Sequence, residues 1–232
     1  MKLSRRIILE LALFSLIYGF SLASIVSFIV RPRFEKIEHE QALADLNRVH
    51  ALVDQEMRAL DANLLGYASW DETVDYAEKP SQDYIDVNYS QAWLASIDAE
   101  ALCIADASGR ILYEVAYDPV SDKRMDLDGF FSRETSPGRA LAATPGLKAL
   151  SGFTLLDGKI FLAASRPIRN SADDSPSYGR IVFGRFYTSR DEARVSELMR
   201  LKVSFDPGIE GRGIRQQGPV LLATEPLPSL GG

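Results

Sequence analysis

The longest apolar run of the chain extends from Leu11 to Val30, twenty residues without a charged side chain. About 20 apolar residues at the helical rise are enough to cross the hydrocarbon core of a bilayer. Basic residues lie on both sides of the run, at Lys2, Arg5 and Arg6 before it and at Arg31, Arg33 and Lys36 after it. The pattern predicts one transmembrane helix.

A cleaved signal peptide or a buried core helix would also give such a run. Ser21, Leu22 and Ala23 have the small-residue spacing of a cleavage site, but the run continues seven residues past Ala23. This length favours an uncleaved anchor. The equal number of basic residues on the two sides leaves the orientation open under the positive-inside rule. Because a short amino terminus most simply stays inside, we expect the chain after Arg31 to be exported.

The residues that follow have the composition of a long helix. Phe34–Leu65 contains no Gly or Pro and is rich in Glu, Leu, Ala and Arg, and we expect Gly66 to end it. One apolar stripe runs along the segment, formed by Leu46, Val49, Val53, Met57, Leu60 and Leu64. The stripe either packs on the sheet of its own domain or pairs two copies of the chain in a parallel homodimer, and both contacts can occur at different heights.

Shorter apolar segments in the second half of the chain predict strands. Five segments have this character: Ala101–Ala105, Ile111–Val115, Phe153–Leu156, Ile160–Ala164 and Gly179–Tyr187. The first two are joined by a Gly-containing turn, and the next two by Asp157 and Gly158, which tolerate positive φ and favour a tight hairpin. We therefore expect an antiparallel sheet.

The segments around these strands predict loops and helices. Asp126–Ala149 mixes Gly and Pro with short apolar groups, which favours short helices and loops over one face of the sheet. Ser189–Lys202 predicts a helix capped by Ser189. Its inward-facing residues should be Val195, Leu198 and Met199. Gly208–Gly218 predicts a flexible loop, and Val220–Ala223 a last strand.

Composition narrows the class of protein. The 232 residues carry a formal net charge of −6, which gives no basic surface for nucleic acid. Cys103 is the only cysteine, so no intrachain disulfide can form, and its apolar surroundings predict a buried thiol. The sequence contains neither G-x-S-x-G nor H-E-x-x-H. We expect a protein that is not an enzyme and needs no cofactor or metal.

An aromatic and acidic segment follows the long helix. If it is helical, one face carries Tyr67, Trp70, Val74 and Ala77, with Asp71 and Asp75 beside it. Such a face can form a pocket wall, although aromatic faces more often pack a core and paired acids more often face water. Spacing alone favours packing.

Trp70 and Asp71 in this segment, Asn88 after a Pro-interrupted spacer, and the long preceding helix resemble the fourth class of CHASE domains. These are extracytoplasmic sensory modules of bacterial and archaeal signalling receptors. Gly158–Ile168 and Gly179–Arg185 look like later strands of that family. The resemblance implies an α+β fold, in which a long N-terminal helix continues from the transmembrane helix and packs on a PAS-like or Cache-like antiparallel sheet.

The resemblance also implies a division of the chain and a function. Residues 1–33 would be a short cytoplasmic segment and anchor, 34–205 the sensory domain, and 206–232 an extension or linker. The chain would be a single-pass protein of the inner membrane whose periplasmic or extracellular domain binds a small ligand and signals across the membrane. Related receptors couple such domains to histidine kinases of two-component systems, or to diguanylate cyclases and phosphodiesterases of cyclic di-GMP signalling.

Two further expectations concern function. The alternative to a sensor is a structural or scaffolding membrane protein whose outer domain binds another protein. No second apolar run of membrane-spanning length occurs between Arg31 and Gly232. We therefore expect the chain to be the sensory part of a larger receptor, or a shortened descendant of one.

The ligand-binding residues implied by the family motif are Trp70, Asp71 and Asn88, with Tyr67 and Tyr76 as neighbours and Arg166 as a cationic contributor from the sheet. An indole floor, a carboxylate and an amide suit a small polar or cationic ligand. The competing hypothesis is architectural. In it, Trp70 fills the junction of helix and sheet, and Asp71 and Asn88 bind backbone groups of Lys79–Asp83.

Overall fold

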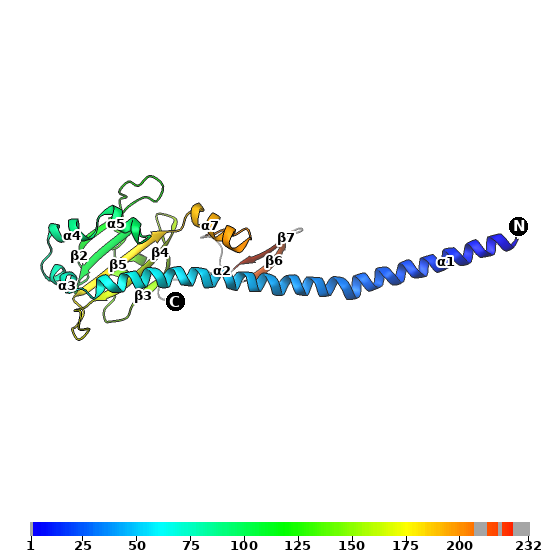
Figure 1. Ribbon diagram of the computed structural model, residues 1–232, viewed down its shortest axis with the longest axis horizontal. Helices are drawn as coiled ribbons and strands as arrows, with labels where there is room; N and C mark the ends of the chain where they lie inside the picture. The colour runs from blue at the N-terminus through cyan, green and yellow to red at the C-terminus, as the bar shows by residue number, and fades with distance from the viewer. Residues whose placement is uncertain (1, 207–212, 218–219, 225–232) are drawn as a thin grey trace. The chain divides into compact units, whose positions relative to one another are not determined.

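The computed structural model describes residues 2–206, 213–217 and 220–224. Contacts between Cα atoms divide the chain into two units, 1–47 with 211–225 and 48–210 with 226–232. One helical path begins with α1 (Lys2–Ile25), passes through the π-helical turn η1 (Val26–Val30) and continues as α2 (Arg31–Ala68) (Figure 1). The predicted continuous helix over 34–65 is confirmed.

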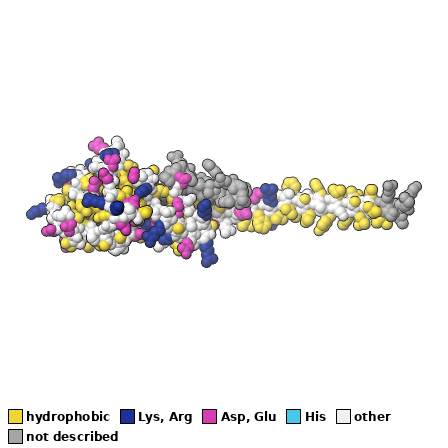
Figure 2. All heavy atoms as spheres, turned by 90° about the horizontal axis from the view of Figure 1, so that it is seen from above, with side chains coloured by type: hydrophobic (Ala, Val, Ile, Leu, Met, Phe, Trp, Pro, Cys, Tyr) yellow, Lys and Arg dark blue, Asp and Glu magenta, His cyan; other side chains and the backbone are white. Residues whose placement is uncertain are grey.

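In the first unit, the apolar side chains of residues 7–30 are almost all exposed, and Figure 2 shows apolar side chains all along this segment, with Lys and Arg where the apolar stretch ends. Among the described residues, one helix is long and apolar enough to cross a membrane. The π-helical turn ends just before Pro32. Proline has no N–H to donate, and a wider turn is one way for a helix to pass it. The unit also contains an antiparallel hairpin of β6 (Gly213–Gln217) and β7 (Val220–Thr224).

The second unit is an α+β domain built on one five-stranded sheet, as the sequence predicts. Its elements after α2 are α3 (Asp71–Glu78), α4 (Gln82–Asn88), α5 (Gln91–Ser96), β1 (Ala101–Asp106), β2 (Ile111–Ala116), α6 (Pro137–Ala143), β3 (Leu150–Leu156), β4 (Lys159–Ile168), β5 (Gly179–Phe186) and α7 (Ser189–Met199). The strand order is β2-β1-β5-β4-β3, and every neighbouring pair is antiparallel.

Alternation along the strands gives the sheet two apolar faces. Leu102 and Ile104 of β1 point to the face covered by α2 to α5, whereas Cys103 and Ala105 point to the face covered by α6 and the segment before it. Cys103 is fully buried, as predicted. On the face covered by α2 to α5, the buried residues of α2 are Val53, Leu60, Leu64 and Ala68. The long helix is therefore a wall of the sheet's core.

The hairpin between β3 and β4 is confirmed. Asp157 and Gly158 have φ of 52° and 69°, so both central residues of the turn are left-handed. Two such residues give the turn a twist that matches the right-handed twist of the strands. The helix and loop cover predicted for 126–149 is also present, with α6 lying on the sheet.

Several local expectations are wrong. The helix runs through Gly66 to Ala68, and Trp70 is extended with φ −90° and ψ 135°, so Tyr67 and Val74 lie on different helices rather than on one face. Thr188, not Ser189, caps α7, because Asp191 binds back to its backbone and completes a capping box.

Two further expectations near the carboxy terminus also fail. Leu198 is 61% exposed instead of facing inward. Residues 213–217 form a strand where the Gly-rich composition predicts a loop, and the rest of that predicted loop, 208–212 and 218, lies outside the described residues. The predicted strand over 220–223 is confirmed as β7.

Candidate functional site

The predicted motif begins at the break between α2 and α3. The Trp70 ring, 38% exposed, lies 4.4 Å from the Tyr67 ring, centroid to centroid. The Tyr67 hydroxyl accepts a hydrogen bond of 2.8 Å from Trp93 Nε1 on α5, and its ring also contacts Phe183 of β5. Tyr67 therefore joins the end of the long helix to α5 and the centre of the sheet.

Tyr76 occupies the second half of the same aromatic cluster. Its ring stacks on Tyr84 with centroids 4.8 Å apart, and burial raises the pKa of Tyr76 to about 12. The Tyr84 hydroxyl contacts the hydroxyls of Thr73 at 2.7 Å and Tyr89 at 3.1 Å, and Thr73 donates to the Tyr67 carbonyl. These buried hydroxyls find their partners within the protein, so the cluster is neutral and internally bonded.

Asp71 and Asn88 lie at the margins of this cluster. The exposed Asp71 carboxylate accepts 2.8 Å and 2.9 Å hydrogen bonds from the backbone N–H and hydroxyl of Ser171, and those bonds lower its pKa. Asn88 Nδ2 donates to the Tyr84 carbonyl at 2.9 Å. The expected partners in 79–83 are therefore wrong. Asp71 instead fastens α3 to the β4–β5 loop, a contact between residues 100 positions apart.

Arg166 is engaged elsewhere. On β4, it donates two hydrogen bonds to Asp61 of α2. The structure thus gathers Tyr67, Trp70 and Tyr76 into one aromatic cluster and uses Arg166 to attach the long helix to the sheet.

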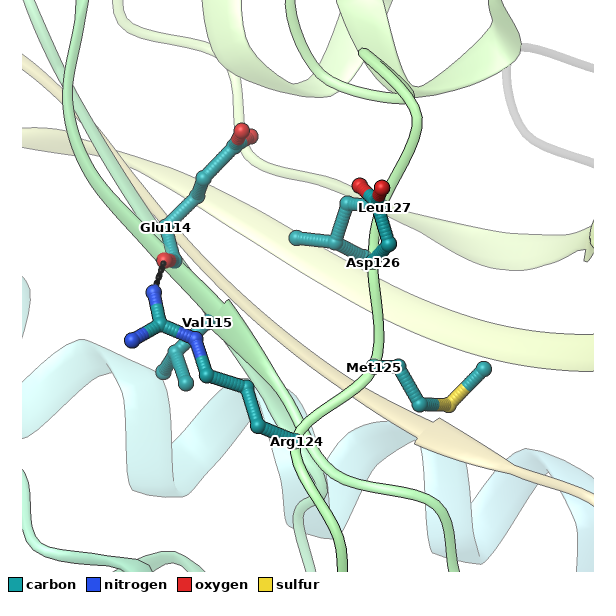
Figure 3. Close-up of a pocket in the computed structure, with 6 residues that line it drawn as sticks. All are labelled: Glu114, Val115, Arg124, Met125, Asp126 and Leu127. Atoms are coloured by element: carbon teal, nitrogen blue, oxygen red, sulfur yellow. Dashed lines mark hydrogen bonds between the residues drawn. The ribbon is translucent and has the colours of Figure 1, made fainter.

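A cavity of about 380 Å³ lies at the edge of the sheet, along β2 and the segment that follows it. Figure 3 shows the carboxylates of Glu114 and Asp126 rising on the same side of it, while Arg124 turns back to the Glu114 carbonyl. Burial, and then the charge of Asp126, raise the pKa of Glu114. This cavity has an acidic wall, and none of its lining residues belongs to α2.

An ionic cluster that the sequence analysis did not single out joins α2, β5 and α7. Arg185 of β5 is 7% exposed and pairs with both Asp98 and Asp191. Arg194 of α7 pairs with Asp191 and with Glu56 of α2. Glu56 also accepts a hydrogen bond from the hydroxyl of Tyr187, the residue after β5. The only local sequence signal was the Asp–Arg spacing of three on α7.

A second cavity, of about 300 Å³, lies beside this cluster. Its walls come from α2, from the end of α5 and the turn after it, and from Arg185 and Arg194. Leu60 and Ile97 supply apolar surface, and Asn63 and Ser96 supply polar groups. No group of three His, Cys, Asp or Glu side chains within the described ranges is placed to hold a metal ion.

A family model described as the CHASE4 domain matches residues 52–206, well over half of the chain. The chain belongs to the CHASE4 family. The match begins within α2 and ends after α7, so both cavities, the aromatic cluster and the ionic cluster lie inside the CHASE4 domain. No curated protein matches the chain.

Solved structures similar to this CHASE4 protein include a histidine kinase sensor domain. The sensor domain of the Vibrio cholerae histidine kinase DctB is 15% identical with a TM-score of 0.48, over 73% of this chain and 62% of that one. The periplasmic domain of V. cholerae LuxQ is 11% identical with a TM-score of 0.47, over 68% and 71%. The chain spans only 59% to 63% of three of the solved domains it matches.

Proposed function

We propose that the chain is a membrane-anchored extracytoplasmic sensor, which binds a small ligand and transmits the event through α2. The observation that carries the proposal is the continuity of one helix. The helical path that contains the apolar residues 7–30 also places Val53, Leu60 and Leu64 in the core of the CHASE4 sheet.

The physical basis of transmission is close packing. Core side chains interdigitate with little free space, so a change in the sheet or in α7 displaces the helix that packs against it. A ligand shifts that equilibrium only by the difference between its affinities for the two arrangements. In the proposal, the ligand site must therefore include a group that moves with α2.

The proposal also covers the module that receives the signal and the pairing of two copies of the chain. The helix would carry the signal to a histidine kinase, diguanylate cyclase or phosphodiesterase module on the other side of the inner membrane. Pairing of two copies along α2 remains a prediction. Ligand contacts by Trp70, Asp71 and Asn88 also remain a prediction, beside the architectural contacts that these residues make.

The test uses the full chain in lipid nanodiscs and follows thermal unfolding against a library of small polar metabolites. A ligand that binds only the folded state at 100 times its dissociation constant stabilises it by about 2.7 kcal/mol. We expect at least one compound to raise the melting temperature saturably. If no compound does so, and the domain instead retains a second protein from the periplasm, the scaffolding alternative replaces the sensor.

A further inference from the structure

The cavity between α2, β5 and α7 has walls from both the long helix and the last helix of the domain. Glu56 and Asn63 come from α2, Arg185 from β5 and Arg194 from α7. Its volume of about 300 Å³ is at the lower end of the range for small-molecule sites. A ligand here would touch the two helices that frame the domain.

Charges beside this cavity do not balance. Two arginines, Arg185 and Arg194, face three carboxylates, those of Glu56, Asp98 and Asp191. The cluster therefore has one negative charge in excess. At the same time, Arg185 is 93% buried, because its exposed fraction is 7%, and its Nε has no hydrogen-bond acceptor within the described residues. A buried donor without an acceptor is costly.

We infer that this cavity binds a small dipolar ion, a molecule with one carboxylate, one ammonium group and a short apolar chain. The inference rests on the proposed sensor function and names the ligand class of that sensor. A carboxylate supplies the acceptor that Arg185 lacks. An ammonium group offsets the excess negative charge. The apolar chain lies against Leu60 and Ile97.

Simpler ions satisfy only half of these requirements. A plain carboxylate that takes the place of Asp98 leaves the excess negative charge of the cluster as it was, and a plain amine leaves the Arg185 Nε–H without an acceptor. The ligand carboxylate accepts from the Arg185 Nε–H, while Asp98, which pairs with Nη1 and has a side chain 73% exposed, returns to water at little cost. The two arginines and the ligand ammonium group then balance Glu56, Asp191 and the ligand carboxylate.

The same geometry links ligand binding in this cavity to the position of α2 relative to α7. The Glu56–Arg194 ion pair connects α2 to α7 at the wall of the cavity. A ligand ammonium group competes with Arg194 for Glu56, and a ligand carboxylate competes with Glu56 for Arg194. Binding therefore changes the only ion pair described between these two helices.

The experiment titrates the full chain in nanodiscs with the amino acids glycine, alanine, valine and leucine, and with the two halves of valine, isovalerate and isobutylamine. We expect at least one amino acid to raise the melting temperature saturably, while the two half-molecules leave it unchanged. Equal stabilisation by either half-molecule overturns the inference.

A blocking variant locates the site. Asn63 is exposed on α2 and lines the cavity, so Asn63→Trp should fill it, and Ala62→Trp, on the same helix but outside the lining, is the control. We expect Asn63→Trp to weaken amino-acid binding at least about tenfold, or 1.4 kcal/mol, and Ala62→Trp to leave it unchanged. Ala59→Phe is a second blocking variant should Asn63→Trp fail to fold. Unchanged binding in the folded blocking variant overturns the inference. Stabilisation by other library compounds with no response to any amino acid overturns the ligand class alone and leaves the sensor function standing.

Discussion

Arg166 Nε donates to Asp61 Oδ1 at 2.8 Å, and Arg166 Nη2 donates to Asp61 Oδ2 at 2.7 Å. The two parallel bonds attach β4 to the long helix beside the buried Leu60 and Leu64. Both side chains are 24% exposed, so the pair is screened less than a surface ion pair.

Arg166→Met should lower the free energy of unfolding by about 1–3 kcal/mol, because it leaves a half-buried carboxylate without its partner. Urea denaturation measures the change. The matched control is Arg133→Met, whose ion pair with Asp128 is between side chains 61% and 79% exposed. The control should change stability by less than about 0.5 kcal/mol. Equal losses of stability in the two variants would contradict a stabilising role of the Arg166–Asp61 pair.

Asp71→Asn should loosen the β4–β5 loop while leaving the core intact. Asparagine replaces one of the two acceptor oxygens with an NH2 donor, so one of the two bonds from Ser171 must reverse or break, and the charge that strengthens both is lost. We expect faster amide hydrogen exchange at Ser171 and a small fall in melting temperature. Because the pKa of Asp71 is lowered in the folded state, wild type should show the same loosening as pH falls through that pKa. Unchanged exchange at Ser171, combined with loss of ligand stabilisation, would instead assign Asp71 to the ligand.

Tyr67→Phe should lower the free energy of unfolding by about 1–2 kcal/mol, because Trp93 Nε1–H loses its acceptor inside the aromatic cluster. Guanidinium denaturation gives the value. Tyr113→Phe on β2 is the control, since its hydroxyl makes no hydrogen bond described in the structure. A stable Tyr67→Phe protein would mean that the hydroxyl serves something other than the cluster.

Local features of this chain could be predicted from the sequence, and long-range pairs could not. The Asp157–Gly158 hairpin and the buried Cys103 follow from residue type and alternation within a few positions. The partners of Asp71, Arg166 and Glu56 lie 100, 105 and 131 positions away, and no local pattern specifies them. For the same reason, the charged wall of the second cavity went unrecognised.

The predicted end of the long helix at Gly66 is wrong for a different reason. Gly66 costs a helix roughly 1 kcal/mol relative to Ala, which tertiary packing can offset. Here Leu64 and Ala68 are buried in the sheet core on either side of it, so the helix passes through. Trp70 then turns out of the helix to lie against Tyr67.

Stability should fall as pH rises from about 4.5 toward 7. Glu100 accepts a hydrogen bond from the Phe186 N–H, but burial raises its pKa from 4.5 to about 7 in the folded state. Folding therefore favours the protonated form, so its contribution is full below pH 4.5 and is lost as pH rises through about 7. The loss is on the order of 3 kcal/mol. Glu100→Gln should flatten this part of the pH profile, whereas Glu134→Gln, at an exposed position, should not. A profile unchanged by Glu100→Gln would contradict the assignment.

The proposed sensor function requires that the CHASE4 domain lies outside the membrane and the amino terminus inside. Cys103 is the single native cysteine and is fully buried, so Cys103→Ala gives a chain without thiols. Single cysteines can then be placed on either side of the apolar run. In that background, Val120→Cys places a thiol at a position 86% exposed in the domain, and Ser4→Cys places one before the apolar run. Spheroplasts are treated with a membrane-impermeant maleimide before and after permeabilisation. We predict that Val120→Cys is labelled in intact spheroplasts and Ser4→Cys only after permeabilisation. The reverse pattern would contradict the proposed sensor function.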